Sequence, residues 1–359
     1  MLTILAFIII LGLLVFVHEL GHFLVAKKLG IKVEEFGFGF PPRIFGIKRG
    51  ETLYSLNLIP LGGFVKIFGE DGEEKSSQRS FAAKKIWQRA SVLLAGVTMN
   101  IVLAIALLSL GYMIGLPWAI DDSQAASGAK VQITQVVAAS PADKAGMKVG
   151  DIILSVSTAD GSQLSGADKV ISVQDFIDKN KGRDLVVLLK RGQADFQVSI
   201  VPRVSPPLNE GAMGVALARV TEISFPWQRA IWEGTKETFS LIWLIISSLA
   251  YLIWQFLSSG RGAGEVIGPV GIFSITGQAA SMGFVYLLQL AALLSANLAI
   301  VNALPFPALD GGRVLFLLIE KIKGSPVSQA VEKAVHTAGF AFLILLMIVI
   351  TLKDITRLF

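Results

Sequence analysis

Long apolar runs separated by polar stretches are the dominant pattern along this chain of 359 residues. Residues 2–26 contain no lysine, arginine or aspartate. A helix of that length rises about 37 Å, which exceeds the roughly 30 Å hydrocarbon core of a bilayer. Similar apolar runs occupy 91–115, 283–303 and 338–352. The pattern predicts a polytopic α-helical membrane protein with about four transmembrane helices.

The composition supports this prediction and narrows the chemistry. Hydrophobic residues make up 53% of the chain, charged residues only 16%, and the mean hydropathy is +0.64, which excludes an ordinary soluble enzyme. The absence of cysteine excludes disulfides, cysteine-zinc sites and thiol catalysis. In a membrane protein, lysine and arginine report orientation rather than affinity for nucleic acid, so the net charge of +5 predicts no nucleic-acid partner.

The segment between the first two apolar runs, 27–90, has basic flanks, which predicts a cytoplasmic position for it. Within it, "TLYSLNLIPLGGFVKIFG" alternates polar and apolar residues around a Pro-Leu-Gly-Gly turn. This alternation predicts a β-hairpin over 51–68 that dips toward the membrane. From about 116 to 220 the chain becomes polar and glycine-rich with short β-type runs, and by parity this region lies outside the cytoplasm.

A candidate metal site lies inside the first apolar run, in "HELGH". His18 and His22 are four residues apart, so on a helix they share one face and can hold the same zinc ion. Glu19 projects near the open coordination position, where a carboxylate can take a proton from the attacking water. The alternative is that neighbouring helices satisfy the two histidines. Ionisable groups at membrane depth favour the functional interpretation.

A catalytic zinc needs a third protein ligand at the same depth, and Asp310 in "NALPFPALDGGR" is the strongest candidate. Pro305 and Pro307 are expected to break the helix before it, which places a carboxylate on irregular backbone. The alternative for Asp310 is a helix cap or a turn residue before two glycines.

The "HELGH" and "NALPFPALDGG" motifs together resemble the site-2 protease family of intramembrane zinc metalloproteases, and more narrowly its bacterial regulator-of-sigma-E branch. The segments "GFGFPPR", "IPLGGFVK" and "GPVGI" follow in the expected order. The resemblance implies one Zn²⁺ per chain, held by His18, His22 and Asp310, with Glu19 as general base. It also implies that Asn302 contacts the substrate or polarises the scissile carbonyl, with Asn297 a weaker candidate.

The same resemblance makes the 51–68 segment a re-entrant element whose edge pairs with an unwound substrate. Strand addition is physically reasonable, because a transmembrane helix hides its peptide bonds until it is extended. The substrate-binding residues expected on this edge are Gly62, Gly63, Phe64 and Val65.

A fifth apolar run, 238–257, creates a conflict of topology. Asp310 has to meet the histidines near the cytoplasmic side, so 283–303 has to run inward and an odd extra crossing is not allowed. We therefore predict that 238–257 does not span the membrane and instead packs as an interfacial or partly buried helix beside the core. His336, near the start of the last run, is interpreted as an interfacial residue rather than a ligand.

The segment "ASPADKAGMKVGDIILSV" resembles a PDZ domain, in which Ser140 and Pro141 start a short helix and Gly146 ends it. One such α+β domain is expected, inserted outside the cytoplasm, either to bind a peptide or to act as a size filter. The loop at Ser127–Lys130 gives no clear carboxylate-binding signature. The expected organisation is 1–115 for the first two transmembrane helices and hairpin, 116–220 for the PDZ domain, 221–280 for interfacial helices and "GPVGI", and 281–359 for the last two transmembrane helices.

These features predict an intramembrane zinc endopeptidase of the inner membrane. The family resemblance implies that its substrates are single-pass proteins, such as an anti-sigma factor or remnant signal peptides, whose outer domain another protease has already shortened. One alternative is a catalytically silent membrane PDZ receptor, which Glu19 disfavours because a metal-only scaffold needs no carboxylate there. A divalent-metal transporter is disfavoured because the sequence shows no internal repeat.

Overall fold

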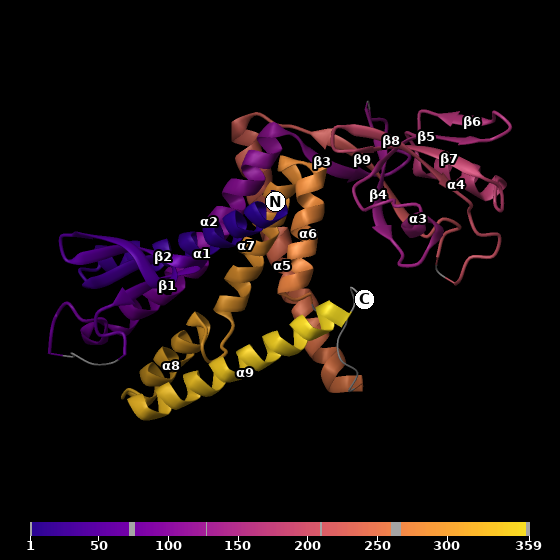
Figure 1. Ribbon diagram of the computed structural model, residues 1–359. Coiled ribbons are helices and arrows are strands. Elements are labelled where there is room, and N and C mark those ends of the chain that lie inside the picture. Colours follow the sequence, from indigo (N-terminus) through magenta and orange to yellow (C-terminus); the bar gives the residue numbers. More distant parts are fainter. Residues whose placement is uncertain (1, 72–75, 127, 209, 260–266, 357–359) are drawn as a thin grey trace. The chain divides into compact units, whose positions relative to one another are not determined.

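The computed structural model describes residues 2–71, 76–126, 128–208, 210–259 and 267–356 (Figure 1). The chain divides into two compact units. The first unit consists of Met1–Leu110, Ile231–Thr276 and Leu288–Phe359, and the second of Gly111–Ala230 and Gly277–Leu287.

Long apolar helices dominate the first unit. Among the described residues, the helices that lie wholly or partly in this unit are α1 (Leu2–Lys28), α2 (Ile86–Ile114), α5 (Trp227–Ser259), α6 (Pro269–Met282), α7 (Phe284–Ala303), α8 (Asp310–Lys323) and α9 (Gln329–Thr356), with a short 3₁₀ turn η1 at Phe81–Ala83. Among the described helices, α1, α2, α5, α7 and α9 are long and apolar enough to cross a membrane. The chain is therefore an integral membrane protein with several apolar helices, as its hydropathy pattern predicted.

Helix α5 contains the 238–257 run that was expected at the interface. Its mean hydropathy of 1.8 is the lowest of the five candidate spans, and none of its most apolar window is buried within the protein. The next helix, α6, has 14 residues and rises about 21 Å, less than the roughly 30 Å hydrocarbon core. Length and composition do not decide whether α5 crosses, so its interfacial position stays a prediction. Residues 260–266 of the linker lie outside the described residues.

Strands β1 (Val33–Arg49) and β2 (Thr52–Ile67) form an antiparallel sheet whose pairing differs from the predicted hairpin. Phe36 pairs with Tyr54 and also with Val65, so the first part of β1 lies between the two arms of 51–68. The predicted pairing of these arms with each other was therefore wrong. Alternation predicts which residues are extended, but it does not identify the partner of each strand.

A buried apolar cluster fixes the sheet against the ends of three helices. It joins the C-terminal end of α1 with the sheet, α2 and α8. Its buried members are Ala26, Ile31, Val33, Ile67, Phe81, Val92, Leu93 and Leu317. Since interiors pack at the density of organic crystals, this cluster holds the histidine-bearing helix and the start of α8 in a defined register.

The second unit contains one seven-stranded sheet in the order β3-β9-β4-β5-β7-β8, with β6 pairing with β5. The strands are β3 (Leu116–Ile120), β4 (Lys130–Val136), β5 (Ile152–Thr158), β6 (Gln163–Ser165), β7 (Leu185–Arg191), β8 (Ala194–Ile200) and β9 (Val215–Ile223). The same unit also contains two short helices, α3 (Pro141–Lys144) and α4 (Val170–Lys179). Residue 127, in the loop considered for carboxylate binding, lies outside the described residues.

Local signals in this unit formed as the sequence predicted. Pro141 is the first residue of α3, and the Ser140 hydroxyl accepts a hydrogen bond from the Asp143 backbone N–H. Asp151, which is fully buried, follows Gly150 at the start of β5. Its carboxylate receives two hydrogen bonds from Arg191, at 2.6 Å from Nε and 2.7 Å from Nη2. This bidentate pair ties the turn before β5 to the end of β7.

Candidate metal centre

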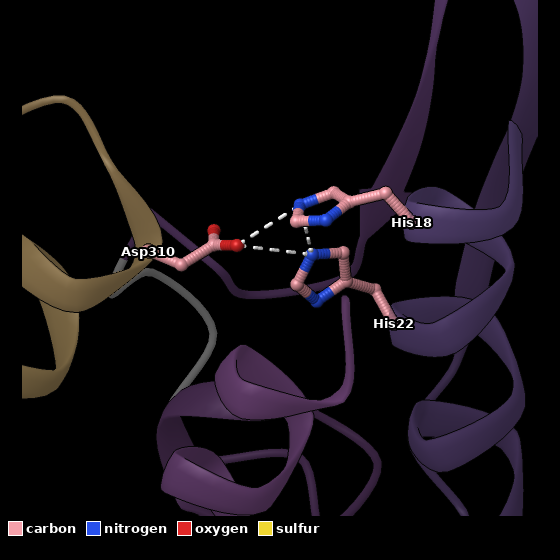
Figure 2. Close-up of side chains that lie close together, drawn as sticks. All are labelled: His18, His22 and Asp310. Carbon is pink, nitrogen blue, oxygen red and sulfur yellow. Dashed lines mark hydrogen bonds and ion pairs between the residues drawn. The ribbon is translucent and has the colours of Figure 1, made fainter. Parts of the chain in front are cut away.

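Helix α1 brings two imidazoles into one buried site. His18 and His22 lie one turn apart on the helix and are each 7% exposed. Their Nε2 atoms are 3.2 Å apart (Figure 2). The prediction that both histidines face the same point is confirmed, because residues four apart in a helix share a face.

Asp310 approaches both histidines from a different part of the chain. It is the first residue of α8, and its Oδ2 lies 3.0 Å from His18 Nε2 and 3.3 Å from His22 Nε2 (Figure 2). The helix cap is Leu309, so Asp310 does not serve as the N-cap, which was the alternative for this residue. The structure therefore brings together the three side chains that the sequence proposed as ligands.

The arrangement of these atoms fits a zinc ion. Zinc–ligand bonds of about 2.0–2.1 Å in a tetrahedral site separate the ligand atoms by roughly 3.3–3.4 Å, close to the three spacings of 3.0, 3.2 and 3.3 Å. Asp310 Oδ2 is buried and has no hydrogen bond among the described residues, although it faces both imidazoles. Two imidazole nitrogens and one carboxylate oxygen form a donor set that suits zinc.

Two glycines allow α1 and α2 to approach closely enough to form the site. A Cβ on Gly21 would lie 2.4 Å from the Ala95 carbonyl oxygen. A Cβ on Gly96 would lie 2.5 Å from His22 Nε2 and 2.6 Å from His18 Cε1. Gly96 therefore provides the space in which the two imidazole rings lie.

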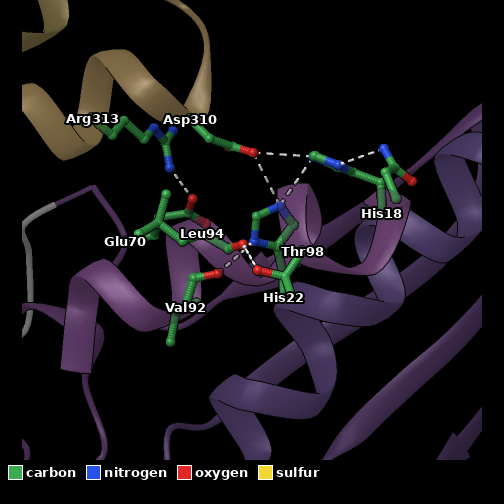
Figure 3. Close-up of polar contacts among 9 residues, drawn as sticks. His18, His22, Glu70, Val92, Leu94, Thr98, Asp310 and Arg313 are labelled. Carbon is green, nitrogen blue, oxygen red and sulfur yellow. Dashed lines mark hydrogen bonds and ion pairs between the residues drawn. The ribbon is translucent and has the colours of Figure 1, made fainter. Parts of the chain in front are cut away.

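Helix α2 also orients the rings. His22 Nδ1 lies 2.8 Å from the carbonyl oxygen of Val92, which fixes the proton on Nδ1 and leaves Nε2 free to bind metal (Figure 3). The side-chain amide of Asn100 lies 3.2 Å from His18 Nδ1. Asn100 is fully buried, and its backbone carbonyl accepts a hydrogen bond from the Ser295 hydroxyl of α7. In each histidine, Nδ1 therefore contacts a group of α2, while Nε2 faces Asp310.

Glu19 lies between the histidines in sequence and beside the sheet in space. Its Cγ is 3.6 Å from the point where a Cβ on Gly63 would lie. Gly62 and Gly63 are buried, and Phe64 and Val65 are partly buried. Among the residues predicted to contact substrate on β2, Gly63 therefore lies next to the predicted general base.

The loop between α7 and α8 positions Asp310. Helix α7 ends at Ala303, as the prolines predicted, and a Cβ on Gly311 would lie 2.2 Å from the Leu304 carbonyl oxygen. Only glycine lets the start of α8 fold back so closely on the loop. One turn into α8, Arg313 forms an ion pair with Glu70, which follows β2 (Figure 3). This pair links the sheet to the helix that carries Asp310.

The positions of the two asparagines of α7 leave their proposed roles untested. The Asn297 amide donates to the Leu293 carbonyl of its own helix at 3.2 Å. Asn302 is partly buried in the last turn of α7. Within the part of the chain that the structure describes, neither amide forms a hydrogen bond with His18, His22 or Asp310, so their roles stay predictions.

Sequence reasoning missed Gly96, Asn100 and His336. A signal for Asn100 was present, because a buried amide in an apolar span is costly and needs a partner. Gly96 lies one helical turn before it on the same face. His336 was interpreted as interfacial, but its Nδ1 accepts a hydrogen bond from the Ala308 backbone N–H, at 2.8 Å.

Comparison with known proteins identifies the family. The model of peptidase family M50 matches residues 6–346. The regulator of sigma-W protease RasP of Bacillus subtilis is 32% identical, covering 99% of both chains. A putative zinc metalloprotease of Clostridium perfringens is 38% identical, covering 95% of both chains. A further putative zinc metalloprotease, from Clostridium acetobutylicum, is 34% identical over 97% of this chain and 96% of its own. The chain therefore belongs to peptidase family M50, the site-2 proteases, and is a zinc metalloprotease.

Proposed function

We propose that this metalloprotease is an intramembrane endopeptidase that hydrolyses a peptide bond within or near the membrane segment of a single-pass protein. The observation that carries the proposal is the position of the donor set. Both histidines lie on a helix long and apolar enough to span a membrane, and Asp310 meets them there at 3.0 and 3.3 Å. A hydrolytic site on such a helix lies at membrane depth, so it can act on substrates that are themselves in the membrane.

The proposed roles follow from the chemistry of each residue. His18, His22 and Asp310 hold the metal. Bound zinc supplies a Lewis acid that polarises the scissile carbonyl and lowers the pKa of a water molecule. Glu19 takes a proton from the attacking water and returns it to the leaving amine. Asn302 stabilises the developing oxyanion, in a role like that of other positioned amide donors.

Substrate is proposed to bind as an extended strand along β2. Residues 63–66 have the 35–38 segment as a partner on one side, and Gly63 lies against Glu19. An unwound substrate that adds to the other side would bring its backbone toward the catalytic carboxylate. Gly62, Gly63, Phe64 and Val65 are the proposed contacts, with Asn297 as a further one.

The second unit is proposed to be an extracytoplasmic PDZ domain that admits only substrates with a shortened outer domain. Helix α3 in the "SPADKAG" segment and helix α4 after the short strand β6 support this assignment. The name of the Bacillus relative, regulator of sigma-W protease, supports an anti-sigma factor as one substrate, and remnant signal peptides are a second class. The proposed location is the inner membrane, with the metal centre toward the cytoplasm.

The test compares wild type with Glu19→Gln in detergent, using a model single-pass substrate whose outer domain has been removed. Zinc is determined in both proteins. We expect about one zinc in each and cleavage by wild type only. Glu34→Gln, a carboxylate in the sheet, is the matched control and should cleave normally. Zinc binding without cleavage of any membrane segment by wild type would refute the intramembrane proposal.

A further inference from the structure

Helix α9 contacts the loop that carries Asp310 through one face. The His336 imidazole accepts a hydrogen bond at Nδ1 from the Ala308 N–H, at 2.8 Å. One turn later, a Cβ on Gly339 would lie 2.5 Å from Pro307 Cβ and 2.7 Å from its carbonyl oxygen. The absence of a side chain at position 339 therefore lets α9 approach the loop backbone.

A third contact on the same face extends this interface. The rings of Phe306 and Phe342 lie 5.8 Å apart, centroid to centroid. His336, Gly339 and Phe342 are spaced by three residues, so they share one side of the helix. Figure 1 shows α9 running beside α8, and the Phe316 ring of α8 lies 5.4 Å from the His336 ring.

The loop conformation at this contact is one that alanine does not adopt freely. Ala308 has a φ of 76°, in the left-handed region where a Cβ is unfavourable. Such a conformation persists only when surrounding contacts hold it. Asp310 follows two residues later, so the backbone direction at Ala308 determines where the carboxylate lies.

The surroundings of His336 Nε2 show that the hydrogen bond at Nδ1 is the main polar contact of this side chain. A ring that accepts at Nδ1 carries its proton on Nε2. Nε2 is buried and has no hydrogen-bond partner among the described residues. The ring borders a cavity of about 440 Å³ whose wall also contains Arg313. The contact with Ala308 is therefore the hydrogen bond that this ring forms within the described chain.

We propose that His336 is a positioning residue of the metal centre, because its Nδ1 holds the loop at Ala308 and thereby sets the position of the Asp310 carboxylate. The inference rests on the proposed ligand role of Asp310. Helix α9 would thereby support the metal centre although it contributes no metal ligand. Loss of the hydrogen bond would let the loop leave the left-handed conformation and move Asp310 away from the two imidazoles.

The test uses two substitutions of His336 in the full-length protein. His336→Asn keeps an acceptor oxygen near the position of Nδ1, whereas His336→Leu removes it at similar size. Leucine and asparagine form helices at least about as well as histidine, so neither change weakens α9. Phe340→Leu is the control, because Phe340 is 60% exposed on the same helix.

Zinc affinity, measured by competition with a chelator, is the main readout. We expect His336→Leu to lose about 10-fold to 100-fold, the range typical of residues that orient ligands. His336→Asn should keep most of the affinity, and Phe340→Leu all of it. In cleavage assays His336→Leu should lower kcat with little change in KM, since substrate contacts lie elsewhere.

Wild-type zinc affinity in His336→Leu would overturn the inference. Equal losses in His336→Leu and His336→Asn would also overturn it, because shape rather than the acceptor would then matter. A wild-type protein that binds zinc but cleaves no membrane segment refutes the proposed function alone, since the zinc titration still tests His336. A wild-type protein without zinc refutes both.

Discussion

Replacing Gly96 by alanine tests whether the space beside the two imidazoles is required for the metal centre. The added Cβ would lie 2.5 Å from His22 Nε2, and 2.6 and 2.8 Å from His18 Cε1 and Nδ1. Non-bonded heavy atoms rest at about 3.5 Å or more, so the rings or the helix have to move by about 1 Å. Zinc–ligand distances in well-formed sites lie within about 0.2 Å of their usual values, so a shift of about 1 Å is large on this scale.

A shift of that size removes at least one imidazole from the ligand set. We expect zinc affinity to fall by about 100-fold or more, equivalent to roughly 2.7 kcal/mol. Alanine is a better helix former than glycine by about 1 kcal/mol, so α2 itself should not weaken. A loss of zinc would therefore reflect the clash and not unfolding of the helix.

The assay is zinc competition against a chelating fluorophore in detergent, with circular dichroism to verify helix content. Thr98→Ala is the control. Thr98 is exposed on the same helix, and its hydroxyl donates to the Leu94 carbonyl of its own helix at 2.8 Å. Thr98→Ala should bind zinc as wild type does. Unchanged zinc affinity in Gly96→Ala would refute the inferred packing of α2 against the rings.

Two further substitutions test contacts that the structure adds to the sequence motifs. Asn100→Leu removes the amide beside His18 Nδ1. Zinc affinity should then fall about 10-fold to 100-fold in the same competition assay. An unchanged affinity would show that the His18 ring is oriented without this amide. Asp151→Asn leaves the Arg191 guanidinium without its charged partner. Because Arg191 is 26% exposed, the second unit should lose about 1.5–3 kcal/mol, the range for a hydrogen bond to a charged group. The loss is measured by hydrogen exchange of β5 and β7 amides in the full-length protein. Normal zinc content in Asp151→Asn serves as the control, and unchanged exchange would contradict the structural role of the pair.

The local patterns of the sequence predicted the helices and the ligand types. Two histidines four residues apart share a face in any helix, so "HELGH" indicated a metal site before any fold was known. Pro305 and Pro307 predicted the break between α7 and α8, because proline lacks the N–H that a helix needs. Ser140 likewise predicted the start of α3. In each case the signal and the structure lie within a few residues.

The pairing of β1 with β2 could not be predicted from the sequence and is seen only in the folded protein. The arms of 51–68 were expected to pair with each other, since the turn between them is the nearest one. Instead, both arms pair with 33–38, and the first arm also pairs with 43–49, the segment just before it. Register in a sheet depends on which faces are buried, and α1 and a cluster containing Val33 and Ile67 determine this.

The motifs of the sequence were sufficient to predict a membrane metalloprotease with two histidines and an aspartate as candidate zinc ligands. The contacts that orient these side chains come from distant parts of the chain and are visible only in the folded protein. His22 is oriented by a carbonyl 70 positions away, and His18 contacts an amide 82 positions away. In the loop before Asp310, the Ala308 N–H donates a hydrogen bond to His336 of α9, 28 positions away. Such contacts arise from the packing of separate helices, and packing between distant segments leaves no periodic pattern in the chain.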